Sequence, residues 1–347
     1  WCMIGYHAVS VLADMIVKGV KGFDYERAYE AMKTTAMNPN YDCLPEYRMM
    51  GYVPFDKEAE SVSKTLEYAY DDYCMAQAAK ALGKEDDYKL LSNLSNGWKN
   101  LYDPETRLIR PKDTKGNFLE DFNPLAPWKG FQEGNAVQYT FYVPHQIDEL
   151  VDLVGQETFN NRLDSIFLLS QKNIFGGGKE VDAFAGLKTV YNHGNQPNLH
   201  ISWLFNFSGK PYLSQKWVRA ILDEFYGLEG IHGYGYGQDE DQGQLGAWYV
   251  MSALGLFDVK GLTEIDPKFQ IGAPLFDKVT VRLNKDYYPG EKFVIEAKKQ
   301  AVGDCYLQDI SLNNRPQDTV QLPFSEVVKG GKLVLGLGAS PNEELTH

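Results

Sequence analysis

The fold is decided by residues 61–83, which run SVSKTLEYAYDDYCMAQAAKALG. Apolar side chains recur here at the three- and four-residue spacing of an α-helix. They are Val62, Leu66, Ala69, Tyr73 and Ala76. Ser61 or Ser63 is a suitable N-cap, and Gly83 is a suitable stop. The stretch therefore predicts a helix with one apolar stripe that faces a helical core.

The same spacing recurs along the chain up to about residue 259. Apolar runs within 8–20, 147–154, 217–225 and 245–256 predict four more helices, the first of them stopping at Gly22. Long loops rich in Gly, Pro and Asn connect these runs. Helix pairs joined by such loops predict a mainly α fold, an all-α toroid in which the loops build a cleft.

After residue 258 the pattern changes to the alternation typical of strands. Residues 278–283, 292–297, 306–312 and 332–335 each predict a strand, with Gly-rich or Asn-rich turns between them. This tail predicts a small antiparallel β module of the sandwich sort. We therefore expect a helical catalytic domain over residues 1–259 and a β module over residues 260–347.

Composition excludes two classes of function. The net charge of −13 argues against binding to a phosphate backbone, so no nucleic-acid partner is expected. No apolar run is long enough to cross a bilayer, so no membrane span is expected. The aromatic share of 13% suits a sugar-binding cleft, although aromatic cores use such rings too. The chain begins at Trp1 within what looks like structure, so we expect a missing N-terminal part, which would include any signal peptide.

The first candidate segment for chemistry is GFQEGNA, residues 130–136, followed by Gln138. Glu133 lies near the start of an expected helix, where a glutamate is more often a cap or a dipole partner than a catalyst. The second segment is NHGNQPN, residues 192–198, followed by His200. Its side chains fit an Asn/Pro turn, and they also fit a set of ligands for a hard cation or for sugar hydroxyls.

The third segment is GQDEDQGQ, residues 237–244. Three adjacent carboxylates usually form a solvated surface run, and they also suit calcium, but the spacing does not match an EF-hand. Inverting glycoside hydrolysis requires an acid and a base roughly 6.5–9.5 Å apart. Glu133 fits the acid, and Asp239 and Asp241 fit the base side if the fold brings them to one cleft.

At these segments, and over essentially the whole chain, the sequence resembles glycoside hydrolase family 92, the calcium-dependent exo-α-mannosidases. The motifs that carry the resemblance are YHA at 6–8, GFD at 22–24, GYVP at 51–54, SVSKTLEY at 61–68, EGNA at 133–136, VPH at 143–145, GN at 194–195, GQ at 243–244, AWYV at 247–250 and IGAPLF at 271–276. The resemblance implies an (α/α)6 toroid, of which this chain holds a part, and an N-terminal β domain that completes the cleft.

The resemblance also implies a function, the inverting hydrolysis of terminal α-mannosides of glycans. It places Glu133 on the general acid and Asp239 and Asp241 on the base side. Asn195, Gln196 and Asp241 fall near a Ca²⁺ site that holds sugar hydroxyls and helps to flatten the mannose ring. Such an enzyme would be secreted, periplasmic or at the cell surface.

We assign the neighbouring polar residues to substrate binding. They are Gln138, Asn192, His193 and His200.

The chain departs from the family pattern at several positions. Gln196 replaces the glutamate of the usual Gly-Asn-Glu-Pro and removes a carboxylate near the metal. Asn192-His193 replaces the His-Glu of the α-1,2-specific members, so no α-1,2 preference follows. Val137 and Phe141 replace tryptophans that commonly flank the acid. Two alternatives stay open, an inactive glycan-binding protein and a glycosidase of other sugar specificity on the same toroid.

Overall fold

The computed structural model describes residues 3–176, 186–228, 243–261 and 263–345. Contacts divide the chain into two compact units. The first consists of residues 1–146, 187–190 and 260–265, and the second consists of residues 147–186, 191–259 and 266–347. The division into these units does not follow the domain boundary expected after residue 259. That domain boundary stays a prediction. Each unit is described by itself.

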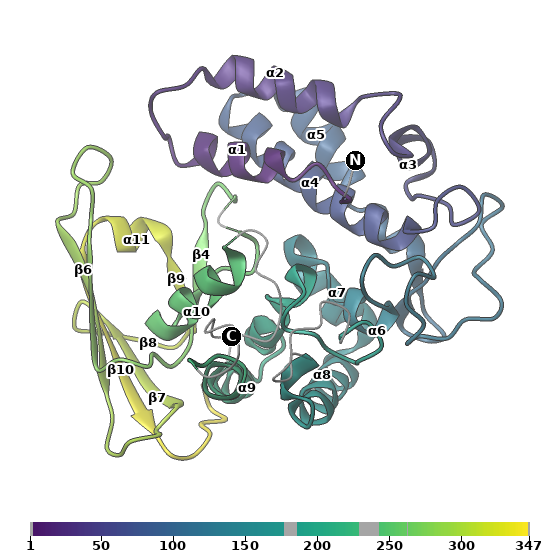
Figure 1. The fold of residues 1–347 in the computed structure, drawn as a ribbon. Coiled ribbons are helices and arrows are strands. Elements are labelled where there is room, and N and C mark those ends of the chain that lie inside the picture. Colours follow the sequence, from purple (N-terminus) through teal and green to yellow (C-terminus); the bar gives the residue numbers. More distant parts are fainter. Residues whose placement is uncertain (1–2, 177–185, 229–242, 262, 346–347) are drawn as a thin grey trace. The chain divides into compact units, whose positions relative to one another are not determined.

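The first unit is helical. Helices α1 (Ala8–Val17), α2 (Tyr25–Ala36), α4 (Ser61–Ala81) and α5 (Glu85–Leu94) pack together, with α4 in contact with the other three (Figure 1). The shorter elements are α3 (Leu44–Met50), α6 (Ala136–Tyr139), the 3₁₀ turns Gly97–Leu101 and Pro144–Gln146, and a hairpin of β1 (Tyr102–Asp103) and β2 (Leu108–Ile109).

Helix α4 confirms the helix expected from residues 61–83, and Gly83 follows it with a left-handed φ of 72°. Two details were wrong. Ser61 is the first helical residue rather than the cap, and Glu60 holds the cap position without a side-chain hydrogen bond. The helix is buried on nearly all sides rather than along one stripe, because α1, α2 and α5 surround it. Its buried face includes Glu67 and Asp71, which therefore need partners.

The second unit begins with α7 (Ile147–Val154) and α8 (Gln156–Gln171), followed by α9 (Pro211–Glu224) and α10 (Gln244–Leu254). Three of these confirm expected helices, whereas α8 was not expected. The 3₁₀ turns of this unit are Ile174–Gly176, Gln196–Asn198 and Ile201–Phe207. The helix expected at 8–20, in the first unit, ends earlier than predicted, at Val17.

The strands of the second unit form a five-stranded and a three-stranded sheet. The larger sheet has the order β5-β6-β10-β7-β8, and the smaller has the order β3-β4-β9. The strands are β3 (Leu256–Phe257), β4 (Lys268–Ile271), β5 (Lys278–Arg282), β6 (Lys292–Lys298), β7 (Tyr306–Leu312), β8 (Arg315–Gln317), β9 (Gln321–Pro323) and β10 (Gly331–Gly338), with α11 (Phe324–Val328) between the last two.

The expectation of a purely antiparallel β module was wrong. Strand β10 pairs antiparallel with β7 but parallel with β6. The reason is topological, because β6 and β7 run in opposite directions and any strand inserted between them must run parallel to one. A helix-rich chain with a small sheet region near its C-terminal end is confirmed, and the toroid stays a proposal.

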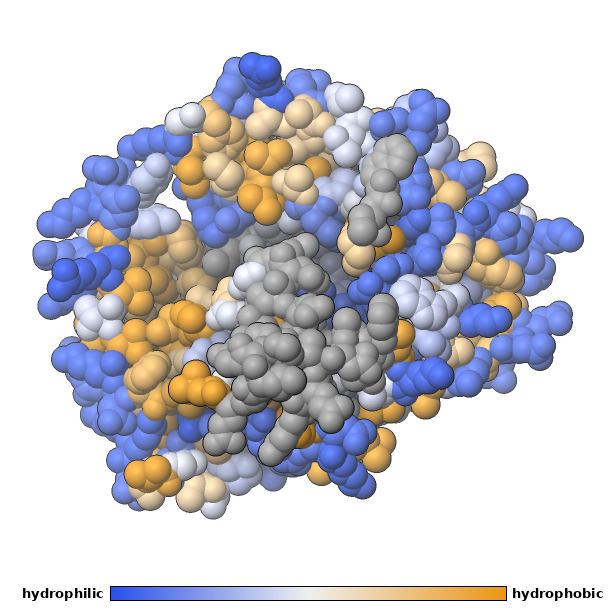
Figure 2. Space-filling view, in the orientation of Figure 1, coloured by the Kyte–Doolittle hydropathy of each residue, from blue (hydrophilic) through white to orange (hydrophobic). Residues whose placement is uncertain are grey.

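On the face shown in Figure 2, apolar side chains gather over α1. Val11 on this helix is 61% exposed. Of the helices in the described part of the chain, none has both the length and the apolar character needed to cross a membrane.

Candidate active site

The segment that carries Glu133 is fixed to the start of α4. We call residues 130–135 the acid loop. The Gly130 N–H donates to the Ala59 carbonyl at 2.9 Å, and the Gly130 carbonyl accepts from the Val62 N–H at 2.9 Å. The Gln132 N–H donates to Ser63 Oγ at 3.0 Å. These bonds place the loop on the first turn of α4, one turn before the buried Glu67 side chain.

Glu133 itself is not a helix cap. The cap of α6 is Asn135, whose Oδ1 accepts hydrogen bonds from the N–H groups of Val137 at 3.1 Å and Gln138 at 3.3 Å. Glu133 lies two residues earlier with a φ of 48°, a left-handed conformation that is uncommon outside glycine. The capping interpretation is therefore wrong, and the catalytic role of Glu133 stays a prediction.

Side-chain amides hold the acid loop and α6 to residues 187–190. Asn135 Nδ2 donates to the carbonyls of Leu187 at 3.0 Å and Thr189 at 2.9 Å. Gln138 Nε2 donates to the Thr189 carbonyl at 2.8 Å, and the Gln138 side chain is buried. Gln138 therefore positions backbone in this structure, and its expected contact with substrate stays a prediction.

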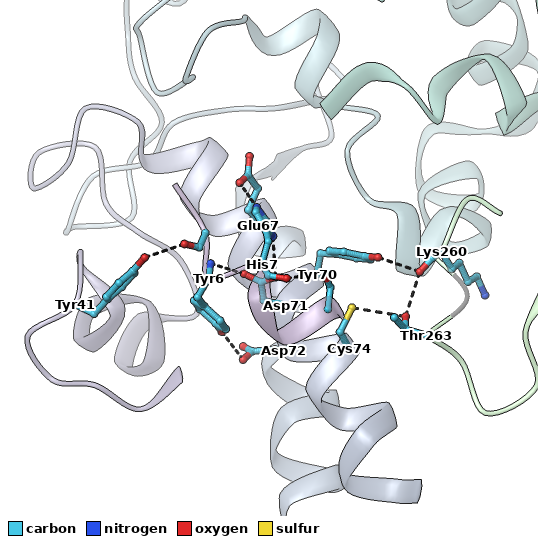
Figure 3. A network of polar contacts seen from close by, with 12 residues as sticks. Tyr6, His7, Tyr41, Glu67, Tyr70, Asp71, Asp72, Cys74, Lys260 and Thr263 are labelled. Atoms are coloured by element: carbon cyan, nitrogen blue, oxygen red, sulfur yellow. Dashed lines mark hydrogen bonds and ion pairs between the residues drawn. The ribbon is translucent and has the colours of Figure 1, made fainter. Parts of the chain in front are cut away.

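A network of buried charges lies along α4. His7, just before α1, is placed between Glu67 and Asp71 (Figure 3). Its Nε2 lies 2.7 Å from Glu67 Oε2, and its Nδ1 lies 2.8 Å from Asp71 Oδ1. Both carboxylates are buried, whereas the His7 side chain is 41% exposed. The imidazole is thus held at both nitrogens, and its remaining edge is open.

The network favours a charged imidazole. Burial opposes the positive charge of His7, but Asp71 and Glu67 outweigh burial and hold the pKa of His7 well above its usual value of 6.5. Burial raises the pKa of Glu67 most, His7 opposes this rise, and the negative charges of Asp71 and Glu133 add to it.

A second buried ion pair anchors the segment before His7. Arg48 donates through both terminal nitrogens to Asp72, with Nη2 at 2.8 Å from Oδ1, and Arg48 Nη2 donates to the Tyr6 hydroxyl at 2.9 Å. The Tyr6 hydroxyl donates to Asp72 at 2.8 Å, and the Tyr6 N–H donates to Asp71 at 2.8 Å. The backbone that carries His7 is thus held to α4 at two points.

In the second unit, His193 is enclosed by aromatic rings. The Tyr226 hydroxyl donates to the Leu245 carbonyl at 3.0 Å, so it accepts from His193 Nε2–H at 2.9 Å. The Tyr191 hydroxyl then donates to Nδ1 at 2.8 Å. Burial lowers the pKa of His193 to about 3, which keeps the ring neutral. A direct contact between His193 and substrate would require one of these hydrogen bonds to break, and it stays a prediction.

The remaining polar residues of this segment lie in and around two consecutive 3₁₀ turns. Asn192 Oδ1 accepts from the Gly194 N–H at 3.0 Å, and the Asn192 side chain is buried. Asn195 precedes the 3₁₀ turn that Gln196 begins. His200 is buried just before the next turn. Together with His193, five of the residues expected at the substrate and metal sites thus lie within residues 192–200.

The base side lies outside the described residues, since Asp239 and Asp241 both fall within 229–242. Within the described ranges, no group of three or more His, Cys, Asp or Glu side chains is arranged to hold a metal. The catalytic, substrate and calcium roles assigned from the sequence therefore all stay predictions.

The network of His7, Glu67 and Asp71 was not predicted from the sequence. Glu67 and Asp71 are four residues apart, on the face of the helix opposite its apolar stripe, where carboxylates are expected to be solvated. Their burial, and hence their need for a cation, therefore had no local signal. The cation had none either, since His7 lies 60 residues away from Glu67 in sequence.

Comparison with known proteins gives a consistent result. A model of the glycosyl hydrolase family 92 catalytic domain matches residues 1–339. The structure of a family GH92 alpha-mannosidase from Bacteroides thetaiotaomicron is 45% identical, with a TM-score of 0.87 over 99% of this chain and 43% of that one. A complex of that enzyme with mannoimidazole gives a TM-score of 0.88 at 43% identity, over 100% of this chain and 45% of that one.

Two further relatives extend the comparison. The Family GH92 inverting mannosidase from Bacteroides thetaiotaomicron VPI-5482 is 34% identical, with a TM-score of 0.85 over 99% of this chain and 47% of that one. An uncharacterized secreted glycosidase of Arthroderma benhamiae is 26% identical over 96% of this chain and 45% of its own length. The chain spans less than half the length of each relative, and it belongs to glycosyl hydrolase family 92.

Proposed function

We propose that the protein is an inverting exo-α-mannosidase that hydrolyses terminal α-mannosides of glycans. The observation that carries this proposal is the family 92 catalytic-domain match over nearly the whole chain. Two relatives add weight, one described as an inverting mannosidase and one solved with mannoimidazole. The described relatives are more than twice as long as this chain, so the proposal concerns the full-length protein.

Glu133 would act as the general acid. Cleavage of a mannoside bond to another sugar expels an alkoxide, so a protonated carboxyl must deliver a proton to the glycosidic oxygen. Asp239 and Asp241 would act on the opposite side, where one orients a water molecule and the other accepts its proton. The rigid attachment of the acid loop to α4 supports this role, because a catalytic carboxyl has to be held within a fraction of an ångström.

Calcium would be held by Asn195, Gln196 and Asp241. The donors fit in kind, because side-chain amide and carboxylate oxygens are what a hard cation prefers, and Asn195 and Gln196 are adjacent at the start of one turn. When bound, the cation would supply an anchor for the sugar hydroxyls. The amide of Gln196 contributes no charge, so Asp241 would carry the negative charge of this set.

We also propose that the full-length protein is exported to the periplasm, the cell surface or the medium. The support is the relative from Arthroderma benhamiae, which is described as a secreted glycosidase.

The test is an assay of the full-length protein on α-mannobioses of different linkages, with and without a calcium chelator. We expect release of mannose, its initial appearance as the β-anomer by NMR, and loss of activity on chelation. Glu133→Gln should abolish turnover of mannobiose, whereas Glu105→Gln, which changes an exposed glutamate of the same unit, should not. Glycan binding without turnover by the wild type would favour a lectin-like protein, and release of another sugar would favour a different glycosidase.

A further inference from the structure

The large sheet buries one face and exposes the other to solvent. In β6, Phe293, Ile295 and Ala297 are buried, whereas Lys292 and Lys298 at the two ends of the strand are exposed. Side chains alternate along a strand, so residues 292, 294, 296 and 298 share the exposed side. We call these four residues, together with the residues that face them along β5, β10 and β7, the outer face.

The outer face is basic in an acidic protein. Strand register places five exposed cations on it, namely Lys278, Arg282, Lys292, Lys298 and Lys332. Two carboxylates share the face, Glu296 on β6 and Asp309 on β7. The five cations and two carboxylates give the face a net charge of +3, whereas the whole chain carries −13, so the remainder carries −16.

We propose that the outer face binds an acidic polysaccharide, a glycan chain that carries carboxylate, sulfate or phosphate groups. The inference goes beyond the proposed hydrolysis of mannosides, and it rests on that function only for the choice of a polysaccharide as the partner.

The first argument is that most of these cations lack a counter-charge. Lys332 Nζ lies 2.6 Å from Glu296 Oε2. The other four cations, on β5 and β6, form no ion pair and no side-chain hydrogen bond with any residue in the described ranges. Their charges are therefore available to an external anion.

The second argument is a pair of like charges that opposes the stability of the sheet. Arg282 and Lys292 face each other directly in the antiparallel pairing of β5 and β6. Side chains at facing positions have Cβ atoms about 4.5–5.5 Å apart, and like charges there destabilise a sheet. The pair therefore does not serve the fold, whereas an anion that bridges the two side chains would remove their repulsion.

The third argument is the arrangement of the cations in a stripe. Lys292 and Lys298 lie at opposite ends of β6, and their separation in sequence corresponds to about 20 Å at about 3.3 Å per residue. Lys332 lies between them, because it faces Val294 from the neighbouring β10. An extended polymer with anionic groups along its length can therefore contact several of these cations at once and release its own counterions.

The uncharged residues of the outer face favour a polysaccharide over a nucleic acid or a membrane. They are small or β-branched, namely Thr280, Val294, Ser311, Val334 and Gly336. The outer face thus has no aromatic ring on which nucleic-acid bases could stack. It also has no large apolar side chain that could enter a lipid bilayer. Charge and hydrogen bonding are what it offers to a ligand, and membership of a glycoside hydrolase family makes a polysaccharide the fitting polymer.

The test measures binding of the full-length protein to polymers without mannose, so that the proposed active site is not involved. Polygalacturonate supplies carboxylates, dextran sulfate supplies sulfate esters, and unmodified dextran is the neutral reference. In titration calorimetry at low salt, we expect the two acidic polymers to bind and dextran not to bind. The affinity should fall steeply as salt is added, because binding releases counterions.

Two double variants with the same change of charge locate the site. Arg282→Gln with Lys292→Gln should weaken binding of the acidic polymers by roughly tenfold or more. It should also reduce the slope of log Kd against log salt by about 1–2. Lys172→Gln with Lys268→Gln is the control, because both lysines are exposed in the same unit and lie outside the outer face, after α8 and on β4. This control should leave both quantities nearly unchanged.

Unfolding in urea checks that the first double variant is folded. It should be at least as stable as the wild type, because the repulsion between residues 282 and 292 is gone. If it does not fold, Lys278→Gln with Lys298→Gln takes its place, with the same expected loss of affinity.

Three results would overturn the inference. They are no binding of either acidic polymer at low salt, the same affinity in the folded outer-face variant as in the control, and tighter binding to duplex DNA or to vesicles of equal parts phosphatidylserine and phosphatidylcholine. Binding confined to one acidic polymer supports the inference and identifies the anionic group. Binding that depends on the outer face, in a protein that does not hydrolyse α-mannosides, supports the inference and refutes the proposed function.

Discussion

Replacing Arg48 by methionine should strongly destabilise the first unit. Asp72 is fully buried, and Arg48 donates to both of its oxygens. In the Arg48→Met variant, Asp72 still accepts a hydrogen bond from the Tyr6 hydroxyl but has lost the cation that compensates for its charge. Breaking a buried ion pair from one side costs about 3–5 kcal/mol, because the remaining charge stays desolvated. We expect the free energy of unfolding to fall by that amount.

Hydrogen exchange of the α4 amides measures this change in the full-length protein, because these amides exchange only when the unit opens. A loss of about 3–5 kcal/mol corresponds to exchange faster by roughly 10²- to 10⁴-fold. Adding Asp72→Asn to Arg48→Met should restore a large part of the loss, since the stranded charge is then removed. Lys84→Met is the control, because Lys84 pairs with Glu26 at the surface, where ion pairs contribute little.

Two results would refute this reasoning. One is a change of less than tenfold in Arg48→Met, which would mean that water or a conformational change solvates Asp72. The other is a double variant less stable than Arg48→Met, which would mean that the carboxylate is stabilised independently of the guanidinium.

Three more predictions concern other parts of the chain. Because the pKa of His193 is about 3 when folded and about 6.5 when unfolded, the free energy of unfolding should fall as pH drops below about 6.5, by up to about 1.4 kcal/mol per pH unit. His193→Gln should weaken this slope in pH-dependent hydrogen exchange, and an unchanged slope would contradict the assignment. Gly290→Ala should destabilise the large sheet by about 1–3 kcal/mol in urea unfolding, because the new Cβ would lie 2.4 Å from the Gly330 backbone nitrogen. The control is Gly246→Ala on α10, whose Cβ would meet no atom of the described residues beyond its own helix within 4 Å and which should be neutral or stabilising. Asn135→Ala should cost about 1–2 kcal/mol and lower kcat/KM on mannobiose, because it loosens the acid loop; full activity would show that the cap does not position the acid.

The spacing of apolar residues predicted the helices and strands that have a regular apolar face. Helices α4, α7, α9 and α10 and four strands of the large sheet lie where apolar spacing placed them. Helix α8 was not predicted because Asn160 and Ser170 interrupt its apolar face. Asn160 is buried and forms hydrogen bonds with Ser208. The parallel pairing of β10 with β6 had no local signal, because alternation gives a strand but not its neighbour.

The candidate site, too, was predicted only in part from the sequence. The sequence singled out Glu133 by its loop and its resemblance to a family, and the structure adds what no spacing shows, the attachment of that loop to Ser63 and the charge relation with Glu67. Buried pairs such as His7 with Glu67 join residues 60 positions apart, and only tertiary structure reveals them.

The central place of β10 affects how the protein is made. Strands β6 and β7 leave the ribosome before residues 331–338, and each then lacks its inner neighbour. Because β6 and β7 are consecutive and antiparallel, they can pair with each other as a non-native hairpin before β10 is synthesised. This hairpin has to open before β10 can pair with both strands. Slow translation between residues 312 and 331 should therefore favour misfolded nascent chains, whose unpaired strand edges promote aggregation. A chaperone that keeps β6 and β7 apart should increase the yield of folded protein.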